Sequence, residues 1–70
     1  MLDYQDIKMC ISHMERKDLK EQEFYSGGCN CIMQRFVHND DTTYNVSVFI
    51  TLTGQYDPII CLNKSEVQHW

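Results

Sequence analysis

Long apolar runs are missing from this 70-residue sequence, and no stretch approaches the roughly 18 apolar residues that a membrane-spanning helix needs. The first ten residues, MLDYQDIKMC, carry acids where a secretory leader would have a basic segment followed by an apolar one. We therefore expect a cytoplasmic protein that does not enter a membrane.

Common catalytic and cofactor-binding motifs are also missing. The sequence contains no P-loop, dinucleotide-binding fingerprint, H-E-x-x-H pair or EF-hand loop. A nucleophile–base pairing of Cys29 or Cys31 with His38 has no local support, and 70 residues leave little room for a lined substrate pocket. We expect no catalytic residues and a protein that is not an enzyme.

Basic residues are few. Six Lys and Arg are outnumbered by ten Asp and Glu, which gives a formal net charge of −4, and the one basic cluster, Arg16, Lys17 and Lys20, is interleaved with acids. A protein that binds phosphate backbones by itself normally carries a basic stripe, so we expect no direct nucleic-acid binding. An acidic surface suits solubility, and it also suits a partner protein with a basic surface.

The first part of the sequence predicts an amphipathic helix from Met1 to Arg16. Asp3 is a good N-cap, and Asp6 stands three residues later, where the acid of a capping box belongs. Acids near the start and bases near the end complement the helix dipole. The apolar residues of one helix face, spaced by three and four, are Tyr4, Ile7, Cys10, Ile11 and Met14.

The stretch from Thr42 to Gly54 predicts the central strand of an antiparallel sheet, because its side chains alternate between apolar and polar. A second strand is expected from Cys29 to His38. A short one is expected from Ile59 to Leu62, where Pro58 at the entry suits a sheet edge. The apolar row of the central strand consists of Tyr44, Val46, Val48, Ile50 and Leu52.

The region from Asp18 to Tyr25 allows two interpretations. A helix could restart with Asp18 as its cap, or Glu21 to Tyr25 could form a further strand. The following Gly27 and Gly28 suit a tight turn, since glycine adopts positive φ at little cost. We predict an α+β fold, with one N-terminal amphipathic helix packed on a three- or four-stranded antiparallel β-meander, in a single small domain spanning residues 1–70.

Four cysteines raise the question of a metal site. Cys29 and Cys31 are separated by one residue, which is shorter than the usual C-x₂₋₄-C spacing of a zinc site. Cys10 and Cys61 lie in apolar patterns and are explained as small buried hydrophobes. We therefore expect reduced thiols and no cofactor. A small zinc-stabilised structural domain is the alternative, with Cys29, Cys31, Cys61 and His38 as the ligands.

The sequence favours a non-enzymatic protein-interaction module. Its size and acidity are compatible with a small inhibitor or modulator of a larger nucleic-acid-binding complex, of the kind that phages and mobile elements use in counter-defence, anti-CRISPR proteins among them. A homodimeric regulatory protein that buries the second face of its sheet, including Phe49, is a further alternative. The residues expected to bind a partner are Glu21, Glu23, Asp40, Asp41, Tyr56 and Trp70.

Overall fold

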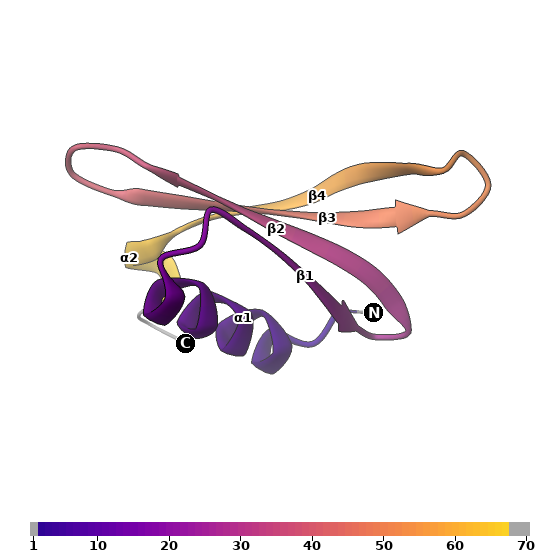
Figure 1. Ribbon diagram of the computed structural model, residues 1–70, viewed down its shortest axis with the longest axis horizontal. Coiled ribbons are helices and arrows are strands. Elements are labelled where there is room, and N and C mark those ends of the chain that lie inside the picture. The colour runs from indigo at the N-terminus through magenta and orange to yellow at the C-terminus, as the bar shows by residue number, and fades with distance from the viewer. Residues whose placement is uncertain (1, 68–70) are drawn as a thin grey trace.

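The computed structural model describes residues 2–67, which form one N-terminal helix followed by a four-stranded antiparallel sheet (Figure 1). The elements are α1 (Tyr4–Lys17), β1 (Glu21–Ser26), β2 (Cys29–Val37), β3 (Thr42–Ile50), β4 (Gln55–Asn63) and α2 (Lys64–Val67). The strands lie side by side in chain order, so the sheet is an open meander. This confirms the predicted α+β class and sets the number of strands at four.

Helix α1 is capped at both ends by its own sequence. The Asp3 carboxylate accepts a hydrogen bond from the Gln5 amide at 2.9 Å, which confirms the predicted N-cap. The helix begins at Tyr4, directly after this cap, and the start predicted at Met1 is wrong. At the other end, Asp18 adopts a left-handed conformation with φ 54°. The amides of Asp18 and Leu19 donate to carbonyls of the last helical turn, so the helix ends at Lys17, one residue later than predicted.

Ser26, at the end of β1, takes the place of the predicted capping box. Its hydroxyl accepts a hydrogen bond from the Asp3 amide at 2.9 Å and donates one to the Asp6 carboxylate at 2.8 Å. The predicted bond between Asp6 and the Asp3 amide is therefore wrong. The Ser26 side chain is buried, and these two bonds satisfy a hydroxyl that would be costly to leave unpaired. They also fix the start of the helix to the end of β1.

The apolar stripe of α1 packs on one face of the sheet. Four of the five predicted stripe residues are buried there, whereas Tyr4 is 64% exposed and does not belong to the core. Each buried aliphatic side chain contributes about 1.5–3 kcal/mol to folding, so this contact is the main source of stability. The core consists of Ile7, Cys10, Ile11 and Met14 of α1, Met33 of β2, Tyr44 and Val46 of β3, and Leu62 of β4.

The region from Asp18 to Tyr25 is a turn followed by a strand, so the second interpretation of the sequence is the correct one. Arg35 of β2 connects this turn to the sheet, because its guanidinium donates to the Asp18 carboxylate at 2.7 Å. The Arg35 amide also donates to the Lys20 carbonyl at 2.8 Å, which extends the β1–β2 ladder by one pair. The predicted second strand, β2, begins at Cys29 and ends one residue before His38.

The tip of the β3–β4 hairpin differs from the prediction. β3 ends at Ile50, whose carbonyl accepts the amides of Thr53 and Gly54 at 3.2 and 2.8 Å and so closes the turn. Leu52 lies in this turn and is 96% exposed, so it does not belong to the apolar row that its spacing suggested. The periodicity runs on past Ile50, but the turn reverses the chain before Leu52 can reach the core.

β4 is longer than predicted. It begins at Gln55 and not at Ile59, which places Pro58 inside the strand and not at its entry. The edge position predicted for Pro58 is confirmed, since β4 is the last strand of the sheet and the missing amide costs no ladder bond there. The register shifts next to it, between Val46 and Ser47 of β3.

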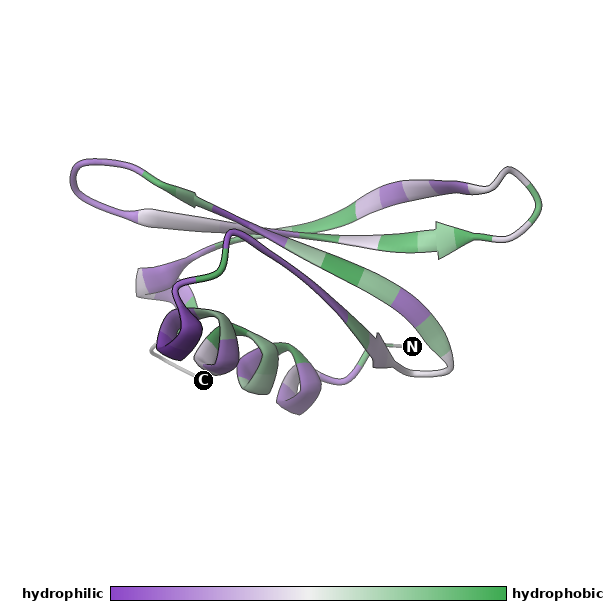
Figure 2. Ribbon diagram, viewed as in Figure 1, coloured by the Kyte–Doolittle hydropathy of each residue, from purple (hydrophilic) through white to green (hydrophobic). Residues whose placement is uncertain are grey.

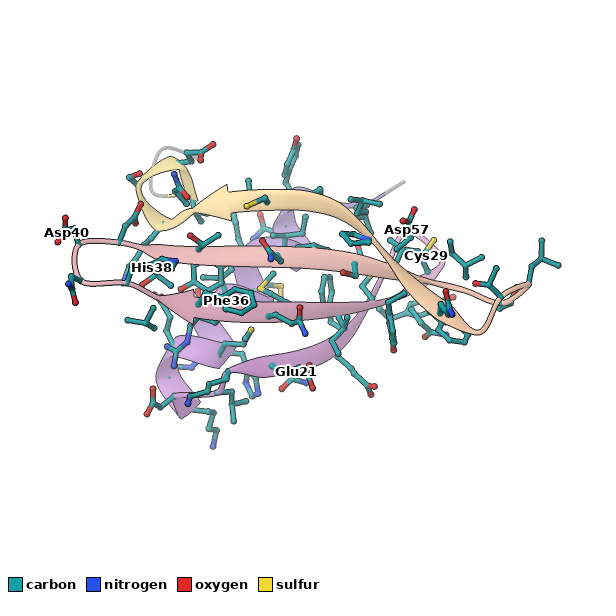
Figure 3. All side chains as sticks on the ribbon, turned by 90° about the horizontal axis from the view of Figure 1, so that it is seen from above. Glu21, Cys29, Phe36, His38, Asp40 and Asp57 are labelled. Carbon is teal, nitrogen blue, oxygen red and sulfur yellow. The ribbon has the colours of Figure 1, made fainter. Side chains whose placement is uncertain are left out.

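The face of the sheet that is turned away from α1, here called the outer face, is not covered by any element of the described chain (Figure 1, Figure 3). Tyr25, Phe36 and Tyr56 are 65%, 45% and 41% exposed. In Figure 3, which looks onto the outer face, Phe36 lies over β2 and Glu21 lies on β1. The strand registers place on this face Glu21, Glu23, Tyr25, Asn30, Ile32, Gln34, Phe36, Thr43, Asn45, Ser47, Phe49, Tyr56, Cys61 and Asn63.

Candidate partner-binding surface

Three of the six residues predicted to bind a partner lie on the outer face. Glu21 and Glu23 project from β1, and Tyr56 projects from β4. Glu23 and Tyr56 both line an open hollow of about 450 Å³, together with Phe49 and other residues of β1 and β2. The rings of Phe49 and Tyr56 pack edge to face with their centroids 5.3 Å apart, which gives the hollow an aromatic wall.

Charge is distributed unequally between the two sides of the sheet. All six Lys and Arg residues lie in the described chain, and none of them is on the outer face. Arg35 and Lys64 form ion pairs with acids of the helix side, at 2.7 Å to Asp18 and 2.8 Å to Glu15. The remaining four bases are Lys8, Arg16, Lys17 and Lys20, in α1 and the turn after it.

The carboxylates of the outer face are therefore not neutralised by any base of their own face. Glu21 accepts a hydrogen bond from the Gln34 amide group at 3.2 Å, and both acids are exposed. Figure 2 shows β1 as hydrophilic along most of its length. The result is a surface that combines acids at one edge with aromatic and aliphatic side chains towards the middle of the sheet.

The other predicted partner-binding residues lie elsewhere. Asp40 and Asp41 belong to the β2–β3 loop, which Figure 3 shows at the far end of the sheet from Cys29. The Asp41 carboxylate accepts the Thr42 amide at 2.8 Å, as expected of a polar turn. The structure does not group these two acids with Glu21 and Glu23. Trp70 lies outside the described residues.

Sequence reasoning missed several residues of the outer face. Ile32 and Phe36 were not assigned to a face, because both faces of β2 carry apolar side chains and periodicity cannot decide between them. Asn45 lies among them with its Oδ1 atom buried and without a hydrogen-bond partner in the described chain. It borders a second shallow hollow, of about 360 Å³, beside Pro58 and Cys61. No local signal in the sequence identifies Asn45, whose environment comes from the pairing of β3 with β4.

The four alternative zinc ligands do not converge. Cys31 faces the helix side of the sheet and is 1% exposed, whereas Cys61 pairs with Asn45 on the outer face. Cys29 is the first residue of β2 and His38 directly follows its last, so Figure 3 shows them at opposite ends of the strand. Nine residues of extended chain span about 30 Å. Among residues 2–67, no group of three or more His, Cys, Asp or Glu side chains is placed to hold a metal ion.

The thiols differ in environment. Burial, together with the neighbouring Cys31 thiol, raises the pKa of Cys10 to about 11. Burial likewise raises the pKa of Cys31 above its usual value. Both thiols therefore favour the neutral form, which is the weaker nucleophile. Cys61 is exposed, so its predicted role as a buried hydrophobe is wrong, whereas that of Cys10 is confirmed.

Comparison with protein-family models, with curated proteins and with solved structures finds no match for this chain. Neither helix of the described residues has the length and apolar character needed to cross a membrane.

Proposed function

We propose that this chain is a non-enzymatic protein-interaction module that binds a partner with a basic surface through the outer face of its sheet. The observation that carries the proposal is the separation of charge: Glu21 and Glu23 lie on a face that has no Lys or Arg, next to uncovered aromatic side chains. A basic partner would gain ion pairs there without meeting a like charge. The aromatic residues supply the apolar contact area that interface anchors need.

One partner surface that would be complementary to the acidic outer face is a basic groove that normally holds the phosphates of a nucleic acid. A small acidic domain placed in such a groove would exclude the nucleic acid, which is how an anti-CRISPR-like inhibitor of a nucleic-acid-binding complex would act. Binding of this kind weakens as ionic strength rises, because salt screens exposed charges over roughly 8–10 Å. The second candidate is a homodimer through the same face, favoured by the exposure of Phe36 and Tyr25 and opposed by the unpaired acids at the β1 edge.

Two charge-reversal variants test the proposal. Glu21→Lys with Glu23→Lys changes the outer face, and Asp40→Lys with Asp41→Lys makes the same change of net charge in the β2–β3 loop. Immobilised wild-type protein captures candidates from cell extract, and each candidate is then purified and its dissociation constant is measured at several salt concentrations. We expect the outer-face variant to weaken binding at least tenfold and the loop variant to leave it nearly unchanged. Equal binding by wild type and the outer-face variant would show that the proposal is wrong.

A nucleic-acid-binding partner allows a second measurement. Wild-type protein should displace a labelled oligonucleotide from the purified partner, and the outer-face variant should not. Native mass spectrometry of the isolated chain addresses the homodimer, since a dimer that dissociates on substitution of Phe36 by Glu would assign the outer face to self-association.

A further inference from the structure

β1 is an edge strand, so half of its backbone groups make no hydrogen bonds within the sheet. The Arg35 amide donates to the Lys20 carbonyl, so in the alternating antiparallel pattern Lys20, Gln22 and Phe24 direct their amides and carbonyls towards β2. The residues between them direct theirs away from the sheet. These residues are Glu21, Glu23 and Tyr25.

The hydrogen bonds of Gln22 confirm this orientation. Its side-chain amide donates to the Glu23 carbonyl at 2.8 Å, so that carbonyl is accessible from outside the ladder. Both groups are on an exposed edge, and a flexible side chain of this kind can be displaced by a strand that offers its own amide. No strand of the described chain lies on this side of β1.

The opposite edge of the sheet is a poorer template. β4 contains Pro58, which has no amide to donate, and the register shift beside Ser47 interrupts its regular pairing. β1 has neither a proline nor a register shift. Of the two edges, β1 is the one that can accept a further strand over its whole length.

A hollow of about 260 Å³ lies beside the same edge, on the helix side of the sheet. It is lined by side chains of α1, among them Met9, Cys10 and His13, and by Phe24 of β1. Met9 is 62% exposed and flexible, which suits the wall of a site that adapts to its occupant. Successive side chains of an added strand point to opposite faces, so every second one would point to the helix side, where this hollow lies beside Gln22 to Tyr25.

The alternate side chains of the same strand would lie on the outer face, next to Glu21 and Glu23. Because no base of this chain is present there, the complementary residues are Lys or Arg of the partner. We propose that the β1 edge is a strand-addition site for an extended partner segment that alternates basic with apolar residues. This inference rests on the proposed function and names the way in which the partner docks.

The test uses a synthetic octapeptide of alternating Lys and Val, with both ends blocked, and backbone amide spectra of the labelled protein. We expect the peptide to slow hydrogen exchange at the amides of Glu21, Glu23 and Tyr25 at least tenfold. A peptide with Glu in place of Lys should not do so. The double variant Glu21→Gln with Glu23→Gln should bind the Lys–Val peptide roughly two- to thirtyfold more weakly, because two exposed ion pairs are lost. Asp40→Asn with Asp41→Asn makes the same change of charge in the β2–β3 loop and is the matched control.

N-methylated peptides test the ladder itself. In an added antiparallel strand, the residues opposite Glu21 and Glu23 make the backbone bonds, so methylation of the Lys amides should abolish binding and methylation of the Val amides should not. The reverse result would indicate a parallel strand, which also supports addition. Retention of binding by both methylated peptides would overturn the inference.

The failure of strand addition can be distinguished from the failure of the proposed function. Peptide-induced changes at Ile32, Phe36 and Tyr56 without protection of the β1 amides would overturn strand addition and leave the outer face as the binding surface. Absence of peptide binding at millimolar concentration would also overturn strand addition. A third outcome is that the peptide protects the β1 amides but a natural partner binds the variant with Glu21→Lys and Glu23→Lys as tightly as wild type. This outcome would support strand addition and reject the proposed function.

Discussion

The Tyr44 hydroxyl donates a hydrogen bond to the Glu15 carboxylate at 2.9 Å, across the contact between β3 and α1. Tyr44 is fully buried, and its ring fills the core while its hydroxyl reaches the rim. The same carboxylate pairs with the Lys64 ammonium at 2.8 Å, at the start of α2. Three elements from distant parts of the sequence thus meet at Glu15.

Tyr44→Phe removes this bond and leaves the core volume almost unchanged. We expect it to lower the free energy of unfolding by about 1–2 kcal/mol, as for a hydrogen bond to a charged group at the edge of a core. Urea unfolding followed by circular dichroism measures the change. Tyr56→Phe, on the outer face, is the control and should have no effect beyond about 0.5 kcal/mol. A Tyr44→Phe variant as stable as wild type would show that the bond does not contribute.

The same carboxylate makes stability depend on acid pH. The hydrogen bond from Lys64 lowers the pKa of Glu15 below its ordinary value of about 4.5, and the bond from Tyr44 adds to the effect. A group whose pKa is lower in the folded state stabilises the fold above its unfolded pKa, and this contribution is lost as the pH falls through the folded pKa. We expect the urea midpoint to fall below about pH 4.5. Glu15→Gln should flatten this part of the profile, and an unchanged slope would contradict the assignment.

Thiol modification should follow burial. Burial raises the pKa of Cys10 to about 11, so at pH 8 its thiol stays almost entirely in the unreactive neutral form, and Cys31 is also buried. Brief treatment of the native protein with iodoacetamide should label Cys61 first, because it is exposed. Peptide mapping by mass spectrometry identifies the site. Cys10 and Cys31 should react only after denaturation, and early labelling of either would mean that the helix opens readily from the sheet.

Chelation should leave the fold unchanged. Cys31 and Cys61 are on opposite faces of the sheet and His38 lies at the far end of β2, so the alternative zinc ligands do not share one ion in this fold. We expect the same thermal midpoint with and without EDTA, and native mass spectra free of a zinc increment. A chelator-sensitive increment of one zinc per chain, accompanied by a lower midpoint, would require a different arrangement of the cysteines.

The sequence predicts those elements whose apolar residues all lie on one side. α1 and β3 meet this condition, and most of the residues predicted for their apolar rows are at least partly buried; the exceptions are Tyr4, Ile50 and Leu52, which are exposed. β2 does not, since Met33 faces the core and Phe36 faces outward with similar hydrophobicity, and only the pairing with both neighbours decides which is which. The N-terminal cap of α1 also depends on a residue distant in sequence. The Asp3 amide donates to the Ser26 hydroxyl and not, as expected, to the Asp6 carboxylate.

For the proposed binding surface, the sequence predicts part of the composition but not the arrangement. Acidic and aromatic residues can be read from the sequence, and Glu21, Glu23 and Tyr56 were predicted on that basis, whereas their exposure is a property of the fold. Their common location follows from the register of β1 on β2 and from the turn that carries β4 back along β3, and both are set by tertiary contacts. The outward backbone amides and carbonyls of β1 cannot be predicted from side-chain composition.

The order of the strands in space repeats their order along the chain. Each strand therefore pairs with the one before it across a short connection, and the loss of chain entropy on closing each connection is small. Assembly can begin at any of the three hairpins and extend to its neighbours without one segment having to pass another. For a protein of mainly β structure, we expect this topology to fold at the fast end of the range, where local contacts dominate.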